Sequence, residues 1–196
     1  LGAGAGIIQQ MNFKDKVSRV CGVDPDPRVE GNPYLHEGKN GMGESIPYAN
    51  ESFDLVFSDN VVEHLSDPDA VLKEVRRVLK PGGLFLAKTP NKKHYMPLIA
   101  RMTPHWFHQF VNKLRGRASE DTFPTLYRMN TSKHLHNFAE ENAFSVQMLK
   151  FIEGRPEYLR MTGFTYLFGL IYERLVNRIG FLERYRILLI MELRKE

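Results

Sequence analysis

The sequence predicts an α/β fold in which a parallel sheet carries helices on both of its faces. Residues 52–60, SFDLVFSDN, have a short apolar centre between polar ends, as expected for a buried parallel strand. Residues 66–83 follow with the apolar spacing of an amphipathic helix. Residues 84–91, LFLAKTPN, predict another strand, so that strand and helix alternate along the chain.

The composition is that of one globular domain in a reducing compartment. The chain has 196 residues, of which 42% are hydrophobic and 26% charged, which argues against disorder. The net charge of +4 is too small to indicate a nucleic-acid partner by itself. The single cysteine, Cys21, excludes a disulfide scaffold, and we expect a cytoplasmic protein. The longest nearly uncharged run, residues 161–172, is too short to span a bilayer.

The N-terminal region begins with a glycine-rich turn, LGAGAG. Residues 7–13 then predict a helix, and residues 16–24 predict a buried strand that ends in an acid. Residues 25–43 are rich in glycine, proline and asparagine, so we expect them to be irregular.

The helix within residues 66–83 has clear signals at both ends. Ser66 or Asp67 can cap its first turn, and Pro68 is tolerated at the start of a helix. Gly82 and Gly83 end it. The apolar side chains that share one face are Val71, Leu72, Val75, Val78 and Leu79.

The C-terminal half changes in character. Residues 92–129 are rich in basic and aromatic side chains and predict an insertion with short helices. Residues 130–144 predict a capped helix and residues 145–154 a strand. An apolar helix over residues 160–179 precedes a final strand over residues 185–195. We expect these two strands, on either side of the helix, to close the sheet with an antiparallel edge.

The glycine turn and the acid that follows it suggest a nucleotide-like ligand. Gly2, Gly4 and Gly6 form G-x-G-x-G, which lets the backbone turn tightly and approach a ligand beside a helix N-terminus. Asp24 ends the next strand, where a carboxylate can accept both hydroxyls of a ribose. Glycines alone are equally compatible with a simple tight turn. Together with Asp24 they favour a nucleoside-bearing ligand.

These motifs, with VDPDP, GESIPYANESFDLVFSDNVVEHL and VLKEVRRVLKPGGLFLAKTPN, resemble a class I S-adenosylmethionine-dependent methyltransferase of the type 11 domain kind. The resemblance is strong from residue 1 to about residue 91. It implies a Rossmann-like sheet and S-adenosylmethionine as the cofactor. We therefore expect one methyltransferase domain over residues 1–196. Its parts are a cofactor-binding half (1–91), a lid or acceptor insertion (92–130) and a C-terminal helix–strand part (131–196).

The resemblance also assigns the cofactor contacts. The glycine loop is expected to lie against the methionine part, Asp24 to hold the ribose hydroxyls, and GMGESIPY to bracket the adenine. Met42 stands where the family commonly has Asp, so it could pack on the ring face while the Gly43 amide reaches a ring nitrogen. The expected cofactor-binding residues are Gly2, Ala3, Gly4, Gly6, Asp24, Met42, Gly43, Asp59 and Asn60.

In this fold a first, central strand precedes the position of Leu1. We therefore expect an N-terminally truncated chain whose first strand is largely missing.

Methyl transfer from a sulfonium depends mainly on proximity and alignment, and we expect no metal. A hydroxyl acceptor would benefit from a general base, for which His94 and His105 are the candidates. Both follow the strand over residues 84–91, beyond the carboxyl ends where such sheets bind ligands. The alternative for each is a surface or packing histidine.

The basic, aromatic run that begins at residue 92 has three interpretations: a solvated lid, a site for an anionic acceptor, or a nucleic-acid surface. The third is the least favoured, because no RNA-binding motif accompanies the run. Tyr127, Arg128 and Arg155 are candidate acceptor contacts, with pairing to nearby acids as the alternative.

The helix at residues 161–180 is apolar almost all round in its first turns. Such a helix packs in a core or against a second subunit, or lies on a membrane surface. In the last case Glu173, Arg174, Asn177 and Arg178 would cluster near the headgroups. Peripheral contact with a membrane therefore remains open.

The function predicted is methyl transfer to a small-molecule, glycan or lipid-precursor acceptor, at an oxygen atom. The oligomeric state is left open. One alternative is a non-catalytic binding or scaffold protein with the same fold, which Met42 favours. A nicotinamide-dependent oxidoreductase is disfavoured by the G-x-G-x-G spacing and by the lack of a Tyr-x-x-x-Lys pair.

Overall fold

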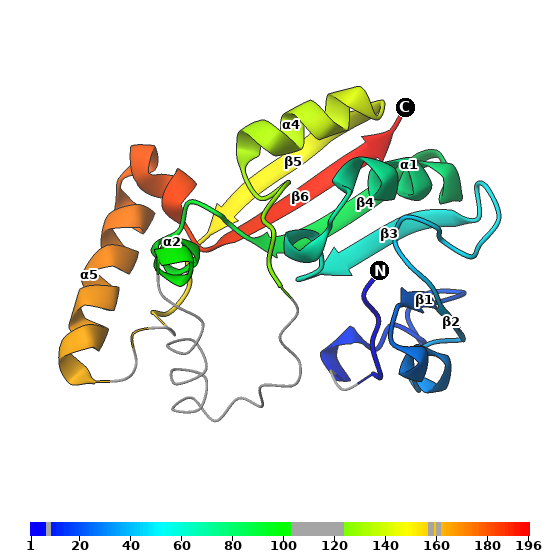
Figure 1. Cartoon of the computed structure of the whole chain (residues 1–196), viewed down its shortest axis with the longest axis horizontal. Coiled ribbons are helices and arrows are strands. Elements are labelled where there is room, and N and C mark those ends of the chain that lie inside the picture. The colour runs from blue at the N-terminus through cyan, green and yellow to red at the C-terminus, as the bar shows by residue number, and fades with distance from the viewer. Residues whose placement is uncertain (7–8, 103–123, 157–158, 160–161) are drawn as a thin grey trace.

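The computed structural model describes all residues except 7–8, 103–123, 157–158 and 160–161. Its strands form two sheets (Figure 1). The smaller sheet pairs β1 (Cys21–Asp24) with β2 (Glu37–Asn40) in parallel. The larger sheet has the strand order β3-β4-β6-β5.

The larger sheet is mixed. β3 (Phe53–Asp59) and β4 (Leu79–Pro90) are parallel, whereas β6 (Leu188–Lys195) runs antiparallel to both of its neighbours, β4 and β5 (Phe144–Ile152). The predicted antiparallel C-terminal strand is confirmed. The two C-terminal strands close the sheet as expected: β6 pairs on both sides and β5 forms the edge.

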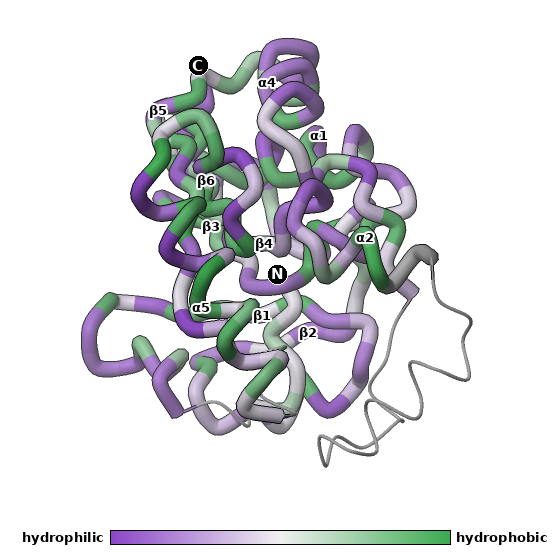
Figure 2. The backbone as a smooth tube through the Cα atoms, turned by 90° about the vertical axis from the view of Figure 1, so that its left-hand side faces the viewer, coloured by the Kyte–Doolittle hydropathy of each residue, from purple (hydrophilic) through white to green (hydrophobic). Residues whose placement is uncertain are grey.

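Two helices, α1 (Pro68–Val78) and α4 (Ser132–Glu141), lie beside each other on one face of this sheet (Figures 1 and 2). The sheet side chains beneath them are buried and alternate along the strands. They include Phe85 and Ala87 of β4 and Leu189, Met191 and Leu193 of β6. On the opposite face Leu84, Leu86 and Ile190 are only half-buried. Among the described residues, therefore, the two faces are covered unequally, which differs from the expectation of helices on both.

The two covering helices begin at side-chain caps. Asp67, rather than Ser66, caps α1 by accepting a hydrogen bond from the Ala70 amide at 3.1 Å. Thr131 caps α4 by accepting from the His134 amide at 3.2 Å. The helix ends predicted from the sequence therefore fall within a few residues of the observed ones.

The N-terminal region differs most from the prediction. The helix expected over residues 7–13 is represented by one 3-10 turn, η1 (Gln9–Met11), and residues 7–8 lie outside the described part. β1 is shorter than the strand expected over residues 16–24. β2 lies within the segment that was expected to be irregular. Its sequence, EGKN, carries no apolar alternation, so the sequence analysis did not predict a strand there.

Two further helices lie beyond the carboxyl end of β4. They are α2 (Tyr95–Met102) and α5 (Gly163–Arg178). α5 is followed by a 3-10 segment, η6 (Gly180–Tyr185), and lies at the end of the molecule opposite β1 and β2 (Figure 1). None of the helices described is both long and apolar enough to cross a membrane.

Candidate functional site

The predicted glycine loop and acid lie in direct contact. The Gly4 amide donates a hydrogen bond to Asp24 Oδ2 at 2.9 Å. Asp24 Oδ1 accepts from the Asp26 amide at 2.9 Å. The loop is fixed to β1 as well, because the Gly2 and Ala3 amides donate to the Val23 carbonyl at 3.0 and 3.4 Å.

Each of the three glycines has a positive φ, but they differ in what surrounds them. A Cβ on Gly2 would lie 2.2 Å from Val61 Cγ2, and one on Gly6 would lie 2.3 Å from Asn32 Oδ1. A Cβ on Gly4 would meet nothing within 4 Å. Gly2 and Gly6 are thus required by packing. Gly4 presents bare backbone to open space, where a ligand can approach closely.

Asn32 is a site residue that the sequence analysis missed. Its side chain is buried, and its Nδ2 donates to the Ala3 carbonyl at 3.0 Å and to the Gly4 carbonyl at 3.1 Å. It therefore clamps the loop from the side opposite Asp24. No sequence motif marks it, because it lies in a turn-rich segment far from the glycines along the chain.

The loop after β2 also reaches Asp24. The Gly41 amide donates to the Asp24 carbonyl at 3.0 Å, and Met42 follows with 54% of its surface exposed. A Cβ on Gly43 would lie 3.2 Å from Val71 Cγ2, so this residue packs against α1. Met42 is thus an exposed apolar side chain beside the acid, as a contact to a flat ring would require.

The end of β3 completes the group. The nitrogen of Leu1 donates to the Phe57 carbonyl at 2.7 Å, and Gly2 packs on Val61, just after Asn60. Asp59 forms an ion pair with Lys88 at 2.7 Å. The N-terminus accordingly lies between β1 and β3 (Figure 1). These contacts link the glycine loop to Asp24 and to the end of β3, and Met42 and Gly43 follow Gly41, which binds the Asp24 carbonyl. The binding role of the predicted cofactor residues stays a prediction.

The donor set of this group fits S-adenosylmethionine. Each Asp24 oxygen accepts one backbone N–H, and a carboxylate oxygen has a second lone pair. Both oxygens can therefore still accept a ribose hydroxyl. The open space at Gly4 leaves room for the ligand next to that carboxylate.

A second buried polar group lies at the carboxyl ends of β3 and β4. Thr89 Oγ1 donates to Glu63 Oε2 at 2.8 Å, and Asn130 Nδ2 donates to Thr89 Oγ1 at 2.6 Å. All three residues are buried, and this burial raises the pKa of the Glu63 carboxyl. The sequence analysis assigned no role to this triad, whose members are distant in sequence.

The predicted acceptor contacts fall in two places. The Tyr127 amide donates to the Glu63 carbonyl at 3.1 Å, and Arg128 Nη1 donates to the Ser66 carbonyl at 2.5 Å. Both residues therefore lie against the connection between β3 and α1. Arg155 is exposed and belongs to the connection between β5 and α5.

The histidine predicted as a base, His94, is 1% exposed. Its Nδ1 accepts from the Met96 amide at 3.2 Å, its ring packs against Tyr95 and Tyr172, and its Nε2 lies 3.5 Å from Glu153 Oε2. Burial lowers the pKa of His94 to about 3 and raises that of Glu153 to about 7. Such a weak, enclosed base disfavours direct proton transfer with a substrate. His105 lies outside the described residues.

Within the described ranges, no three His, Cys, Asp or Glu side chains are grouped as a metal site would require.

Sequence comparison relates the chain to methyltransferases. A family model described as a methyltransferase domain matches residues 1–87. A ubiquinone biosynthesis O-methyltransferase from Cereibacter sphaeroides is 31% identical over 121 residues, covering 58% of this chain and 49% of that protein. The chain thus spans about half the length of the curated relatives it matches.

Two solved structures share the fold. One is an S-adenosylmethionine-dependent methyltransferase from Thermotoga maritima, described as a possible histamine N-methyltransferase. It has a TM-score of 0.61 and 16% identity, over 100% of this chain and 80% of that one. The other is an S-adenosylmethionine-dependent methyltransferase from Methanosarcina mazei. It has a TM-score of 0.60 and 19% identity, over 99% of this chain and 89% of that one. The predicted Rossmann-like α/β fold is confirmed.

Proposed function

We propose that the chain is a class I S-adenosylmethionine-dependent methyltransferase that transfers a methyl group to a small-molecule, glycan or lipid-precursor acceptor. The match of residues 1–87 to a methyltransferase domain supports this proposal. The acceptor atom that we propose is an oxygen. This choice is supported by the name of the Cereibacter sphaeroides relative, a ubiquinone biosynthesis O-methyltransferase.

One observation carries the proposal. Asp24, at the end of β1, is held by the Gly4 amide at 2.9 Å, and Gly4 opens onto free space. A carboxylate and bare backbone are thereby presented side by side, which suits a ligand with ribose hydroxyls at one end and a compact polar chain at the other.

The cofactor supplies an activated methyl group on a positively charged sulfur. In this proposal Asp24 holds the ribose hydroxyls, the residues from Gly2 to Gly6 hold the methionine part, and Met42 covers the adenine. Asn32 keeps the loop in place by binding the Ala3 and Gly4 carbonyls. These residues act by fixing position, since alignment of the reacting atoms supplies most of the rate enhancement in such a displacement.

The acceptor is proposed to bind beyond the carboxyl ends of β3 and β4, with Tyr127, Arg128 and Arg155 as its contacts. The position of Tyr127 over the Glu63 carbonyl supports this placement for the first two. His105 remains the proposed base for a hydroxyl acceptor. A role for His94 requires that it move out of its buried position.

A second candidate function is a non-catalytic binding protein with the same fold. It is favoured by Met42, which leaves the adenine amino group without the carboxylate partner that the family commonly provides. The proposed location is the cytoplasm, and nucleic acid is not among the proposed partners.

Calorimetric titration with S-adenosylhomocysteine tests the proposal. A parallel titration with NADH is the control for a nicotinamide-dependent oxidoreductase. Binding of S-adenosylhomocysteine, together with transfer of labelled methyl from S-adenosylmethionine to a hydroxylated acceptor, is the expected result. Binding without turnover over a panel of acceptors would favour the non-catalytic protein. Absence of binding at millimolar ligand would remove the cofactor assignment.

A further inference from the structure

We propose that the outward face of α5, together with Phe181, docks on a membrane surface that carries anionic lipid headgroups. This inference goes beyond methyl transfer and does not depend on it. It rests on an exposed apolar face, on the sign of the charges around that face, and on a pocket next to Phe181.

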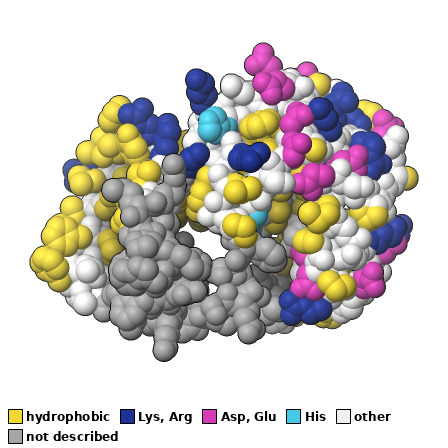
Figure 3. All heavy atoms as spheres, in the orientation of Figure 1, with side chains coloured by type: hydrophobic (Ala, Val, Ile, Leu, Met, Phe, Trp, Pro, Cys, Tyr) yellow, Lys and Arg dark blue, Asp and Glu magenta, His cyan; other side chains and the backbone are white. Residues whose placement is uncertain are grey.

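The outward face of α5 is apolar along the whole helix. Its side chains recur at the spacing of one helical face, and Phe164 is 71% exposed and Leu167 55% exposed. Figure 3 shows these hydrophobic side chains gathered over α5 at one end of the molecule. The apolar residues of this face are Phe164, Leu167, Phe168, Ile171 and Leu175.

The opposite face of α5 already holds the helix to the rest of the chain. Gly169 and Val176 are buried there, and Tyr172 donates to the Tyr185 carbonyl at 2.6 Å. Among the described residues, these buried contacts of the opposite face attach α5 to the body of the protein. A contiguous exposed apolar surface of this kind usually marks an interaction site.

The charges that border the outward face are basic. Arg174 and Arg178 lie on its flank and its C-terminal end, on positions that the helical period places beside Leu167 and Ile171. The nearest acids are engaged elsewhere. Glu173 accepts from Asn177 at 2.6 Å, and Glu183 pairs with Arg186 at 3.4 Å. An apolar face with basic flanks is the arrangement of helices that lie at the surface of anionic bilayers.

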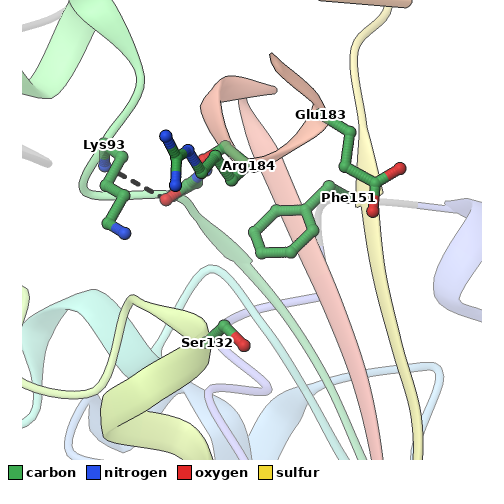
Figure 4. A pocket seen from close by; sticks show the side chains of 6 residues that line it. Lys93, Ser132, Phe151, Glu183 and Arg184 are labelled. Carbon is green, nitrogen blue, oxygen red and sulfur yellow. Dashed lines mark hydrogen bonds between the residues drawn. The ribbon is translucent and has the colours of Figure 1, made fainter. Parts of the chain in front are cut away.

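Past the end of α5 the chain exposes a further aromatic side chain beside a basic one. Phe181, in η6, is 68% exposed, and the guanidinium of Arg184 stacks on its ring at 4.2 Å. Arg184 also lines a pocket of about 230 Å³ (Figure 4). The other lining residues are Asn91, Lys93, Ser132, Phe151 and Glu183.

This pocket suits an anionic group such as a lipid phosphate. Lys93 and Arg184 supply two cations and Ser132 a hydroxyl to its lining (Figure 4). The one acid of the lining, Glu183, pairs with Arg186 at 3.4 Å. Because Arg184 contacts Phe181 as well, the pocket lies next to this exposed ring. A phosphate and its acyl chain could thus engage both at once.

A second copy of the chain fits this face less well. In a two-fold symmetric pairing each copy would present the same surface, so Arg174 and Arg178 would meet apolar side chains or one another. The outward face carries no acid to accept them. Headgroup phosphates would supply that partner, since long basic side chains reach from an apolar surface to the headgroups.

Vesicle flotation without cofactor tests the inference. The chain is mixed with vesicles made of phosphatidylcholine alone or of phosphatidylcholine with phosphatidylglycerol. Light scattering on the chain without vesicles measures its mass in solution. We expect binding to the anionic vesicles that weakens with added salt. Phe164→Ser with Leu167→Ser should weaken it at least about tenfold, and Arg174→Gln with Arg178→Gln about fivefold for each charge removed.

The matched control is Val17→Ser, which removes an apolar side chain of similar exposure (51%) elsewhere on the surface. Its binding should equal that of the unmodified chain. The inference fails if the chain floats with neither vesicle, or if the α5 variants bind like the control. A doubled mass that is lost in Phe164→Ser with Leu167→Ser, without vesicle binding, would assign the face to a second copy instead.

Discussion

Asp24 has two tasks at the scale of single residues. Its oxygens accept the Gly4 and Asp26 amides, so the carboxylate orders the glycine loop before any ligand arrives. In the proposed function the same oxygens also accept the ribose hydroxyls. A substitution there should consequently affect ligand binding more than it affects the fold.

Asp24→Ala is predicted to weaken S-adenosylhomocysteine binding by about 1–3 kcal/mol, through the loss of hydrogen bonds to a charged acceptor. Calorimetry provides the measurement. Asp54→Ala is the control, since the Asp54 carboxylate is exposed at the other end of β3 and pairs with Lys80. Equal affinities for the two variants would mean that the nucleoside lies elsewhere.

Glu153→Gln is predicted to stabilise the protein at alkaline pH. The folded-state pKa of Glu153 is raised to about 7, from 4.5 when unfolded. Between these values the folded chain holds one proton more, so this group makes stability fall as pH rises. In the unmodified chain the Ile187 amide donates to Glu153 Oε2 at 2.9 Å. Gln keeps an oxygen for this amide and removes the pH dependence of stability that the carboxyl causes. We expect a gain of about 1–3 kcal/mol above pH 7.

His94 has the opposite dependence. Its pKa is lowered to about 3 in the folded chain, so its contribution rises with pH between about 3 and 6.5. Between pH 4.5 and 6.5 the two dependences cancel in the unmodified chain, because the folded pair and the unfolded pair each bind one proton. Urea denaturation of the unmodified chain and of Glu153→Gln across pH 4–8 measures how the difference between their free energies of unfolding depends on pH. An unchanged difference between them over that range would contradict the assignment.

The contact between the glycine loop and Asp24 could be anticipated from the sequence, whereas the contacts of the buried polar residues could not. Gly4 and Asp24 belong to a local pattern, glycines followed by an acid at a strand end. Asn32, Thr89 and Asn130 become site residues only through contacts between distant segments. A single polar residue in a turn or at a strand end has no periodicity that would reveal such a partner.

At the scale of elements, the segments with a strong apolar pattern were predicted well. α1 and β3 carry that pattern together with caps and flanking polar residues, and both occur within a few residues of the predicted bounds. β2 was missed because it is held by backbone pairing to β1, with a polar sequence. The helix expected after the glycines is reduced to a 3-10 turn in the described residues.

Gly6→Ala is predicted to destabilise the glycine loop by about 1–3 kcal/mol. The new Cβ would lie 2.3 Å from Asn32 Oδ1, at a φ of +75° that disfavours alanine. Displacing Asn32 would also free the Ala3 and Gly4 carbonyls, so S-adenosylhomocysteine should bind more weakly. Thermal denaturation with and without ligand gives both effects.

Gly31→Ala is the control for this substitution, because its Cβ would meet nothing within 4 Å. Its stability should change by no more than about 0.5 kcal/mol. Comparable losses in the two variants would indicate a general effect of replacing glycine rather than the contact with Asn32.

For the molecule as a whole, β6 is the strand on which the larger sheet depends. It pairs with β4 from Leu84 to Pro90 and with β5 from Phe144 to Ile152. Its buried side chains Leu189, Met191 and Leu193 also belong to the core under α1 and α4. The sequence predicted the strand and its direction. It did not predict the interior place, which depends on how β5 is connected.

A chain that ends at Ile187 is predicted to lose cooperative unfolding. Among the described residues, β5 would lose its only strand partner and β4 would lose one of two. Near-UV circular dichroism and urea denaturation measure the loss. Removing Glu196 alone should leave the transition in place. A cooperative transition in the shorter chain would show that α4 alone can hold β5 to the sheet.

The interior place of β6 has a consequence for biosynthesis. Residues 53–152 can leave the ribosome as β3, β4 and β5, but β5 reaches its position only when residues 188–195 have also emerged. Until then the growing polypeptide exposes two unsatisfied strand borders, which invite pairing with other nascent chains. A chaperone that shields them during translation should therefore raise the yield of native protein.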